Sequence, residues 1–176
     1  MLSDPLPSGF LAVIETICTT LRLHNILWVL TGSASFALQG MQLPIKDIDL
    51  QTDAVGAYKI EAVLAEFVER PVSYSSTGRI RSHYGSLRLS DIQVEIIGDV
   101  EHQLADGGWS TPPDIMATRR WIRHGDLTIP VMSLAHEAQA YERMGRLARA
   151  AEIRHFLSLR HGLLRPSRAG EGPLSP

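Results

Sequence analysis

Apolar residues in the first part of the chain recur with spacings that alternate between helix and strand. Residues 10–23 have apolar groups at helical spacing, and residues 26–31 form a short apolar run typical of a buried strand. Residues 45–50 alternate strictly between apolar and polar side chains, as in a half-buried strand. A further helix is predicted at about 55–69. This order of elements favours an α/β protein.

The second half of the chain continues the same mixture. Residues 79–97 alternate in a way that predicts strands, the last of which is the segment 92–97, IQVEII. Residues 98–118 have the glycine and proline pairs of a loop, and residues 126–133 predict one more short strand. Residues 133–160 predict a pair of helices.

Together these elements predict a small mixed β-sheet flanked by helices and followed by a C-terminal helical extension. The 176 residues suit one main domain. We place that domain at residues 1–132, the extension at 133–165, and a loose, Pro/Gly-rich tail at 166–176.

Composition narrows the class of protein. Apolar residues make up 44% and charged residues 20% of the chain, values typical of a globular protein, and Cys18 is the single cysteine, so no intramolecular disulfide is expected. A net charge of −2 argues against a strongly basic, non-specific nucleic-acid binder. The sequence has neither a long apolar run nor a secretion signal, which predicts a cytoplasmic protein without a membrane span.

Charge differs between the two halves of the chain. Residues 1–100 contain 7 basic and 11 acidic side chains, whereas residues 101–176 contain 10 basic and 8 acidic ones. This imbalance either reflects chance or indicates a metal site in the first half and an anion site in the second.

Gly32 and Ser33 separate the predicted strand at 26–31 from about two helical turns that Gly40 closes. A glycine allows the backbone to approach a ligand closely, and a helix start offers free N–H groups to an anion. Taken alone, the pair is more typical of an ordinary turn in which Ser33 caps the helix.

Asp47 and Asp49 are two residues apart on the alternating segment, so a strand would project both carboxylates from one face. Like charges this close repel unless a cation lies between them, and magnesium commonly uses one or two carboxylates together with phosphate oxygens. The alternative is a solvated strand face on which Lys46 neutralises part of the charge.

A third carboxylate, Glu95, lies inside the apolar segment IQVEII, where an unpaired charge is costly. Asp91 and Asp99 are four residues away on either side, and strict alternation would place all three on one face. We prefer Glu95 because it is central, and we interpret Asp91 and Asp99 as residues of the strand ends.

The order of these features resembles the nucleotidyltransferase superfamily, which includes polymerase β-like, minimal and aminoglycoside-type enzymes. The stretch at residues 28–53, WVLTGSASFALQGMQLPIKDIDLQTD, is similar to the Gly-Ser and Asp-x-Asp core of that family. The segment IQVEII looks like its third-carboxylate strand, although the family often has Asp where this chain has Glu95.

The resemblance implies a magnesium-dependent transfer of a nucleoside monophosphate from a nucleoside triphosphate to a hydroxyl group, with release of pyrophosphate. Asp47, Asp49 and Glu95 would then be the catalytic carboxylates and the ligands of two magnesium ions, with Glu95 also helping to deprotonate the acceptor. Gly32 and Ser33 would bind the β- and γ-phosphates. The acceptor stays open between a small molecule, an RNA 3′ end and a protein, as do the base and the oligomeric state.

Arginines supply candidate phosphate contacts. Arg79 and Arg81 alternate on a predicted strand and could both face the triphosphate, or they could be solvated residues of a strand edge. The last two helices contain a set of arginines that forms either a basic stripe or a solvated face, namely Arg143, Arg146, Arg149 and Arg154.

Other motifs fit the sequence less well. His136 and Glu137 begin a His-Glu-x-x-His zinc motif, but Ala140 stands where its second histidine would be, and the chain contains neither a P-loop nor a dinucleotide fingerprint. Two alternatives stay open: a non-catalytic nucleotide-binding regulatory module, and a toxin that is controlled by an antitoxin partner.

Overall fold

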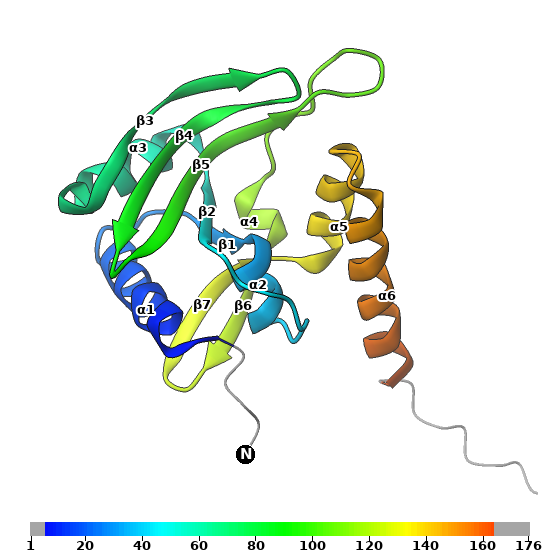
Figure 1. The fold of residues 1–176 in the computed structure, drawn as a ribbon, viewed down its shortest axis with the longest axis horizontal. Coiled ribbons are helices and arrows are strands. Elements are labelled where there is room, and N and C mark those ends of the chain that lie inside the picture. The colour runs from blue at the N-terminus through cyan, green and yellow to red at the C-terminus, as the bar shows by residue number, and fades with distance from the viewer. Residues whose placement is uncertain (1–5, 164–176) are drawn as a thin grey trace, which may run out of the picture.

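The structure, a computed structural model, describes residues 6–163 and consists of a mixed β-sheet with helices on both faces (Figure 1). The strands are β1 (Val29–Thr31), β2 (Ile48–Thr52), β3 (Val68–Thr77), β4 (Ile80–Leu89), β5 (Ile92–His102), β6 (Arg119–His124) and β7 (Leu127–Met132). The helices are α1 (Ser8–Leu23), α2 (Gly32–Leu38), α3 (Ala54–Val63), α4 (Ile115–Thr118), α5 (Leu134–Arg143) and α6 (Leu147–Leu163), with a 3₁₀ turn at Ala65–Phe67.

The strands form one seven-stranded sheet in the order β3-β4-β5-β2-β1-β7-β6. The pairs β2–β5 and β1–β7 are parallel, and the other four pairs are antiparallel. This is the small mixed sheet flanked by helices that the sequence predicted, so the expected fold class is confirmed.

Helices α1 and α3 cover one face of the sheet. The apolar residues of α1 follow the i, i+3, i+4 spacing of a single helix face, and Ile14, Ile17 and Leu21 are fully buried. They join the core with the side chains of β2 and β5 that point the same way, such as Leu50 and Ile96. Because side chains alternate along a strand, Asp49 and Glu95 point to the opposite face.

The opposite face of the sheet is where the helix pair α5–α6 stands, at the right of Figure 1. A second apolar cluster fastens this pair to α2: Phe36 and Met41 pack against Leu134, Ala138 and Ile153. The C-terminal helices are therefore held to the sheet through the element that follows β1.

Most of the helices and strands that the sequence predicts are present. The division of the chain into residues 1–132 and 133–165 stays a prediction. The helix at 10–23, the strands within 26–31, 79–97 and 126–133, and the C-terminal helix pair are confirmed. The tail at 166–176 lies outside the described residues. No helix in the described part is long and apolar enough to cross a membrane.

Three predictions were wrong. The helix expected at 55–69 ends at Val63, and the chain enters β3 at Val68. The segment 98–118 is not all loop, because β5 continues to His102 and α4 forms near its end. The edge strands β3 and β6 were not predicted, since most of their side chains are exposed on both faces and show no alternation of apolar and polar residues.

Candidate active site

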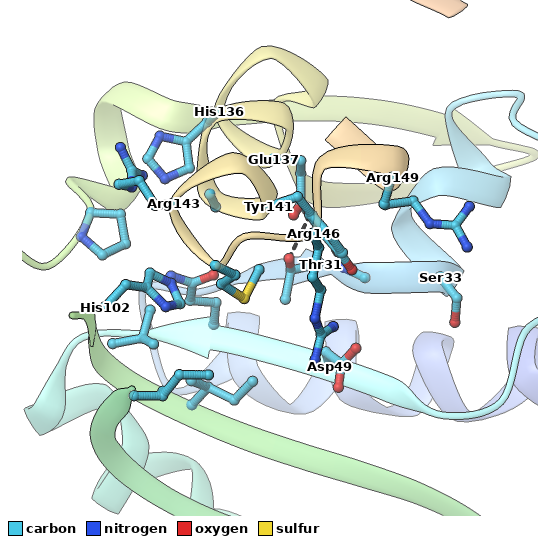
Figure 2. A pocket seen from close by; sticks show the side chains of 18 of the residues that line it. Thr31, Ser33, Asp49, His102, His136, Glu137, Tyr141, Arg143, Arg146 and Arg149 are labelled. Atoms are coloured by element: carbon cyan, nitrogen blue, oxygen red, sulfur yellow. Dashed lines mark hydrogen bonds between the residues drawn. The ribbon is translucent and has the colours of Figure 1, made fainter. Parts of the chain in front are cut away.

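A cavity of about 1060 Å³ lies between the sheet and the α5–α6 pair (Figure 2). Five of the residues singled out in the sequence line it, although they come from three separate segments of the chain. These residues are Gly32, Ser33, Asp47, Asp49 and Glu95. The volume slightly exceeds the usual range for a site that holds one small molecule.

The carboxylates of Asp49 and Glu95 meet because β2 and β5 pair in parallel with these two residues opposite each other. Neighbouring strands are about 4.8 Å apart, so the two side chains leave the same face side by side. Asp47 precedes the first residue of β2 and lines the same cavity. Strand register therefore brings together Asp49 and Glu95, which are far apart in the sequence.

The pKa of Asp49 is raised from 3.8 to about 8. Burial is the largest cause, and the negative charges of Asp47, Glu95 and Glu137 add to it. Four carboxylates thus lie close together in one part of the cavity. This excess of negative charge and the all-oxygen donor set fit a magnesium ion.

The carboxylates do not form a complete metal cage by themselves. Among the described residues, no group of three or more His, Cys, Asp and Glu side chains is arranged to hold a metal ion. Magnesium seldom needs such a cage, because it usually binds one or two carboxylates together with the phosphates of a substrate. The residues present therefore fit a metal that is bound together with the nucleotide.

Gly32 begins α2 with a φ of +68°, a conformation that favours glycine. A Cβ atom at this position would be 2.1 Å from Oδ2 of Asp49. Only glycine can therefore bring this turn so close to the carboxylate. The hydroxyl of the next residue, Ser33, is buried and has no hydrogen-bond partner among the described residues. A buried hydroxyl that lacks a partner and faces a cavity is suited to bind a ligand.

Glu137 is a site residue that the sequence analysis did not identify. It is 4% exposed and reaches from α5 to accept hydrogen bonds from the Thr31 hydroxyl and from the Gly32 N–H, the latter at 3.2 Å (Figure 2). Burial raises its pKa to about 7, although both hydrogen bonds act in the opposite direction. The one signal in the sequence was a carboxylate in the first turn of a predicted helix, and such residues are usually solvated.

Tyr84 was also not predicted, and it lies near Glu95. Burial, followed by the charge of nearby Glu95, raises the pKa of Tyr84 to about 12. Nε2 of Gln93 donates a hydrogen bond to Glu95, at 3.2 Å. The third carboxylate therefore lies beside Tyr84 and is held in place by Gln93.

The two alternatives to Glu95 do not line the cavity. Asp91 lies in the tight turn between β4 and β5, with a φ of +64°. Asp99 has a φ of +45° at an irregularity where β5 has one more residue than β4, which breaks the strict alternation assumed from the sequence.

The structure does not bring Arg79 or Arg81 to the cavity. Arg79 is exposed in the turn between β3 and β4. Arg81 points to the opposite face from Ser82, and its guanidinium makes two hydrogen bonds to Glu101 while lying 4.4 Å from the centroid of the Trp109 ring. Their predicted alternation fails because the strand begins only at Ile80.

Arginines of the helix pair line the cavity instead. Arg143, Arg146 and Arg149 are on its wall, whereas Arg154 forms an ion pair with Glu142 and does not line it. Arg149 pairs with Glu152 at 2.6 Å, and Arg146 lies over the ring of Tyr141. The basic stripe that the sequence left open thus faces the carboxylates across the cavity.

Comparisons with known proteins agree with this geometry. The family model described as aminoglycoside-2″-adenylyltransferase matches residues 13–157. A solved structure from Thermotoga maritima, provisionally described as a nucleotidyltransferase, is 44% identical, with a TM-score of 0.75 over 85% of this chain and 92% of its own. ANT(2″)-Ia, solved with adenylyl-2″-tobramycin, is 11% identical and shares the fold, with a TM-score of 0.52 over 88% and 99%. No curated protein matches the chain.

Proposed function

The chain belongs to the aminoglycoside-2″-adenylyltransferase family, and from this premise we propose that it transfers a nucleoside monophosphate to a hydroxyl acceptor in a magnesium-dependent reaction. The family membership confirms the resemblance that the sequence suggested. It also makes the chain a nucleotidyltransferase and therefore a transferase rather than a silent binding module. The identity of the metal, the release of pyrophosphate and the roles of individual residues belong to the proposal.

The observation that supports it most strongly is the position of Asp49. This carboxylate is half-buried beside Asp47, Glu95 and Glu137, and it lies next to a glycine that leaves no room for a side chain. Such a costly group of like charges is expected at a functional site. Here the carboxylates would hold a cation, and that cation would neutralise the charge of a polyphosphate.

In the proposed reaction, the acceptor oxygen forms a bond to the α-phosphorus of the nucleotide. The bond from that phosphorus to the oxygen that bridges to the β-phosphate breaks, and pyrophosphate leaves with the electron pair. The acceptor proton passes to Glu95, which Gln93 holds in position beside Tyr84. The Ser33 hydroxyl donates a hydrogen bond to the leaving phosphates, which gives its buried oxygen a partner.

Magnesium, held by Asp47, Asp49 and Glu95, would supply neutralisation of the phosphate charge when it is bound. The remaining contribution of the chain is to fix positions. Glu137 ties the Thr31–Gly32 turn to α5, so the turn that carries Ser33 keeps a constant distance from Asp49.

The acceptor is a hydroxyl compound in this proposal. The toxin alternative has no support in the comparisons, so no antitoxin partner is proposed.

A labelling experiment tests the transfer. The protein is incubated with magnesium, cell extract, and ATP, GTP, CTP or UTP labelled at the α-phosphate, and the label is followed into RNA, protein and small molecules. We expect label from one nucleotide in one fraction, with an equivalent amount of pyrophosphate released.

Matched variants identify the site. Asp49→Asn removes the central carboxylate and should lower the rate by at least about 10²-fold. Asp91→Asn is the control, because its turn conformation tolerates Asn and its side chain does not line the cavity. Nucleotide binding without label in any fraction, or equal activity of the two variants, would contradict the proposal.

A further inference from the structure

One end of the cavity contains a group of basic side chains that the proposed reaction does not use. His102 at the end of β5 faces His136 and Arg143 of α5 across the cavity, at the left of Figure 2. Ser33 and Arg149 are at the opposite end, and Asp49 lies between the two ends. The group at His102, His136 and Arg143 is called the basic end below.

The basic end has no anionic partner within the described part of the chain. Arg143 forms no ion pair there. His102 is 92% buried (8% exposed), and its Nδ1 atom has no hydrogen-bond partner. Burial lowers the pKa of His102, and the positive charges of Arg143, His136 and Arg146 lower it further. The positive charges of Arg143 and Arg146 thus lie near a buried nitrogen that has no partner among the described residues and that a hydrogen bond to an anion would satisfy.

The reaction geometry assigns this end to the acceptor. Attacking and leaving oxygens lie roughly in line at the phosphorus. If the leaving pyrophosphate is bound near Ser33 and the α-phosphate near Asp49, the acceptor must approach from the side away from Ser33. That side is the basic end (Figure 2).

The acidic residues of the cavity are already engaged. Asp47, Asp49 and Glu95 belong to the proposed phosphate and metal site. The other two are also paired, Glu137 with Thr31 and Gly32 and Glu152 with Arg149. Among the residues that the structure describes, no lining carboxylate is therefore left at the basic end to bind the ammonium groups of a polycation such as an aminoglycoside.

We propose that the acceptor is an anion: a hydroxyl compound with a phosphate or carboxylate group that binds to Arg143, His102 and His136. This inference rests on the proposed function, because it names the charge class of the acceptor in the same reaction. It also departs from the aminoglycoside in the family description.

The charge of the acceptor can be measured without knowing its identity. The extract is separated on anion-exchange and cation-exchange resins at neutral pH, and each fraction is supplied to the enzyme with the labelled nucleotide. Acceptor activity should be retained by the anion exchanger. Retention by the cation exchanger, or activity in the unretained fraction, would overturn the inference. Label in the RNA or in the small-molecule fraction then distinguishes the two sources of the anionic group.

Substitution of Arg143 tests the residue assignment. In Arg143→Gln, the KM for the retained acceptor should rise by about tenfold or more, while the KM for the nucleotide changes by less than about twofold. Arg120→Gln removes an exposed arginine of β6 and serves as the control. An unchanged KM for the acceptor in Arg143→Gln would refute the site.

A binding measurement separates this inference from the proposed function. Inorganic phosphate is titrated into Asp49→Asn, which should not turn over, and the ring proton signals of His102 and His136 are followed by NMR. The signals should shift in Asp49→Asn and not in the double variant with Arg143→Gln. A shift without any labelling in the wild type would contradict transfer and keep the anion site. The absence of a shift would overturn the anion site itself.

Discussion

Glu137 is an acidic side chain buried where water cannot solvate its charge. Its pKa rises from 4.5 to about 7 in the folded protein, so between these pH values the native state holds a proton that the unfolded state has lost. Stability must therefore fall as the pH rises through this window and stay level above it.

Glu137→Gln should remove this dependence, because the amide oxygen can still accept from Thr31 and Gly32 but no charge is buried. Relative to the wild type, the unfolding free energy of the variant should increase between about pH 4.5 and pH 7 by up to about 3 kcal/mol. Urea unfolding at several pH values measures the difference. If the difference in unfolding free energy between Glu137→Gln and the wild type does not change with pH, burial does not raise the pKa of Glu137.

Asp49 shows how the site opposes the stability of the fold. Its carboxylate is half-buried beside three others, so Asp49→Asn should raise the unfolding free energy by an amount on the order of 2 kcal/mol while it lowers the rate of transfer by at least about 10²-fold. Magnesium and nucleotide together should stabilise the wild type and leave the variant unchanged, since binding to the native state alone raises its stability. Thermal unfolding with and without these ligands checks both effects. Asp91→Asn should retain the ligand response, and a destabilised Asp49→Asn would contradict the account.

At the scale of elements, the sequence predicted the helices and strands whose apolar residues recur at regular spacing. It missed the strands that lack such a pattern. β2, β5 and α1 each have one apolar face packed in the core, which produces a period of two or of 3.6 residues. β3 has Pro71 within it, one buried residue, and register shifts against β4, so its pattern resembles a loop.

The residues of the candidate site also divide into those that the sequence could predict and those that it could not. Gly32, Ser33, Asp47, Asp49 and Glu95 could be predicted because their types and order in the sequence are sufficient to suggest the chemistry. Arg143 belongs to the basic stripe that the sequence left open, but neither its place on the cavity wall nor the role of Glu137 could be predicted, because nothing local in α5 indicates that the helix will fold back over β1. A contact of this kind depends on packing between segments far apart in the chain.

The packing of α6 leads to a prediction about that element. Ile153 is fully buried between α2 and α5, and its replacement by Ala should lower the unfolding free energy by about 2–5 kcal/mol. Leu159 lies on the same helix and is 55% exposed, so Leu159→Ala should change stability by less than about 0.5 kcal/mol. Urea denaturation compares the two. Equal losses would mean that α6 does not pack as described.

At the scale of the molecule, the site depends on how firmly the C-terminal helices are attached. One wall of the cavity comes from the sheet and the other from α5 and α6. The connection consists of the cluster around Phe36 and Ile153, the two hydrogen bonds of Glu137, and a hydrogen bond of 3.1 Å from Arg160 to the Gln39 carbonyl. Such a connection should make the helix pair unfold together with the sheet rather than before it.

The tryptophans allow this cooperativity to be measured. Trp28, Trp109 and Trp121 all precede residue 133, so their fluorescence reports on the sheet, whereas far-UV circular dichroism also reports on α5 and α6. The two signals should give the same urea midpoint in the wild type. In Ile153→Ala, the loss of helix should come first, because the substitution weakens the cluster without touching the sheet core. A wild type in which helix is lost before fluorescence changes would mean that the cavity has a wall that opens on its own. The positions of Arg143 and Glu137 would then describe only a closed form of the enzyme.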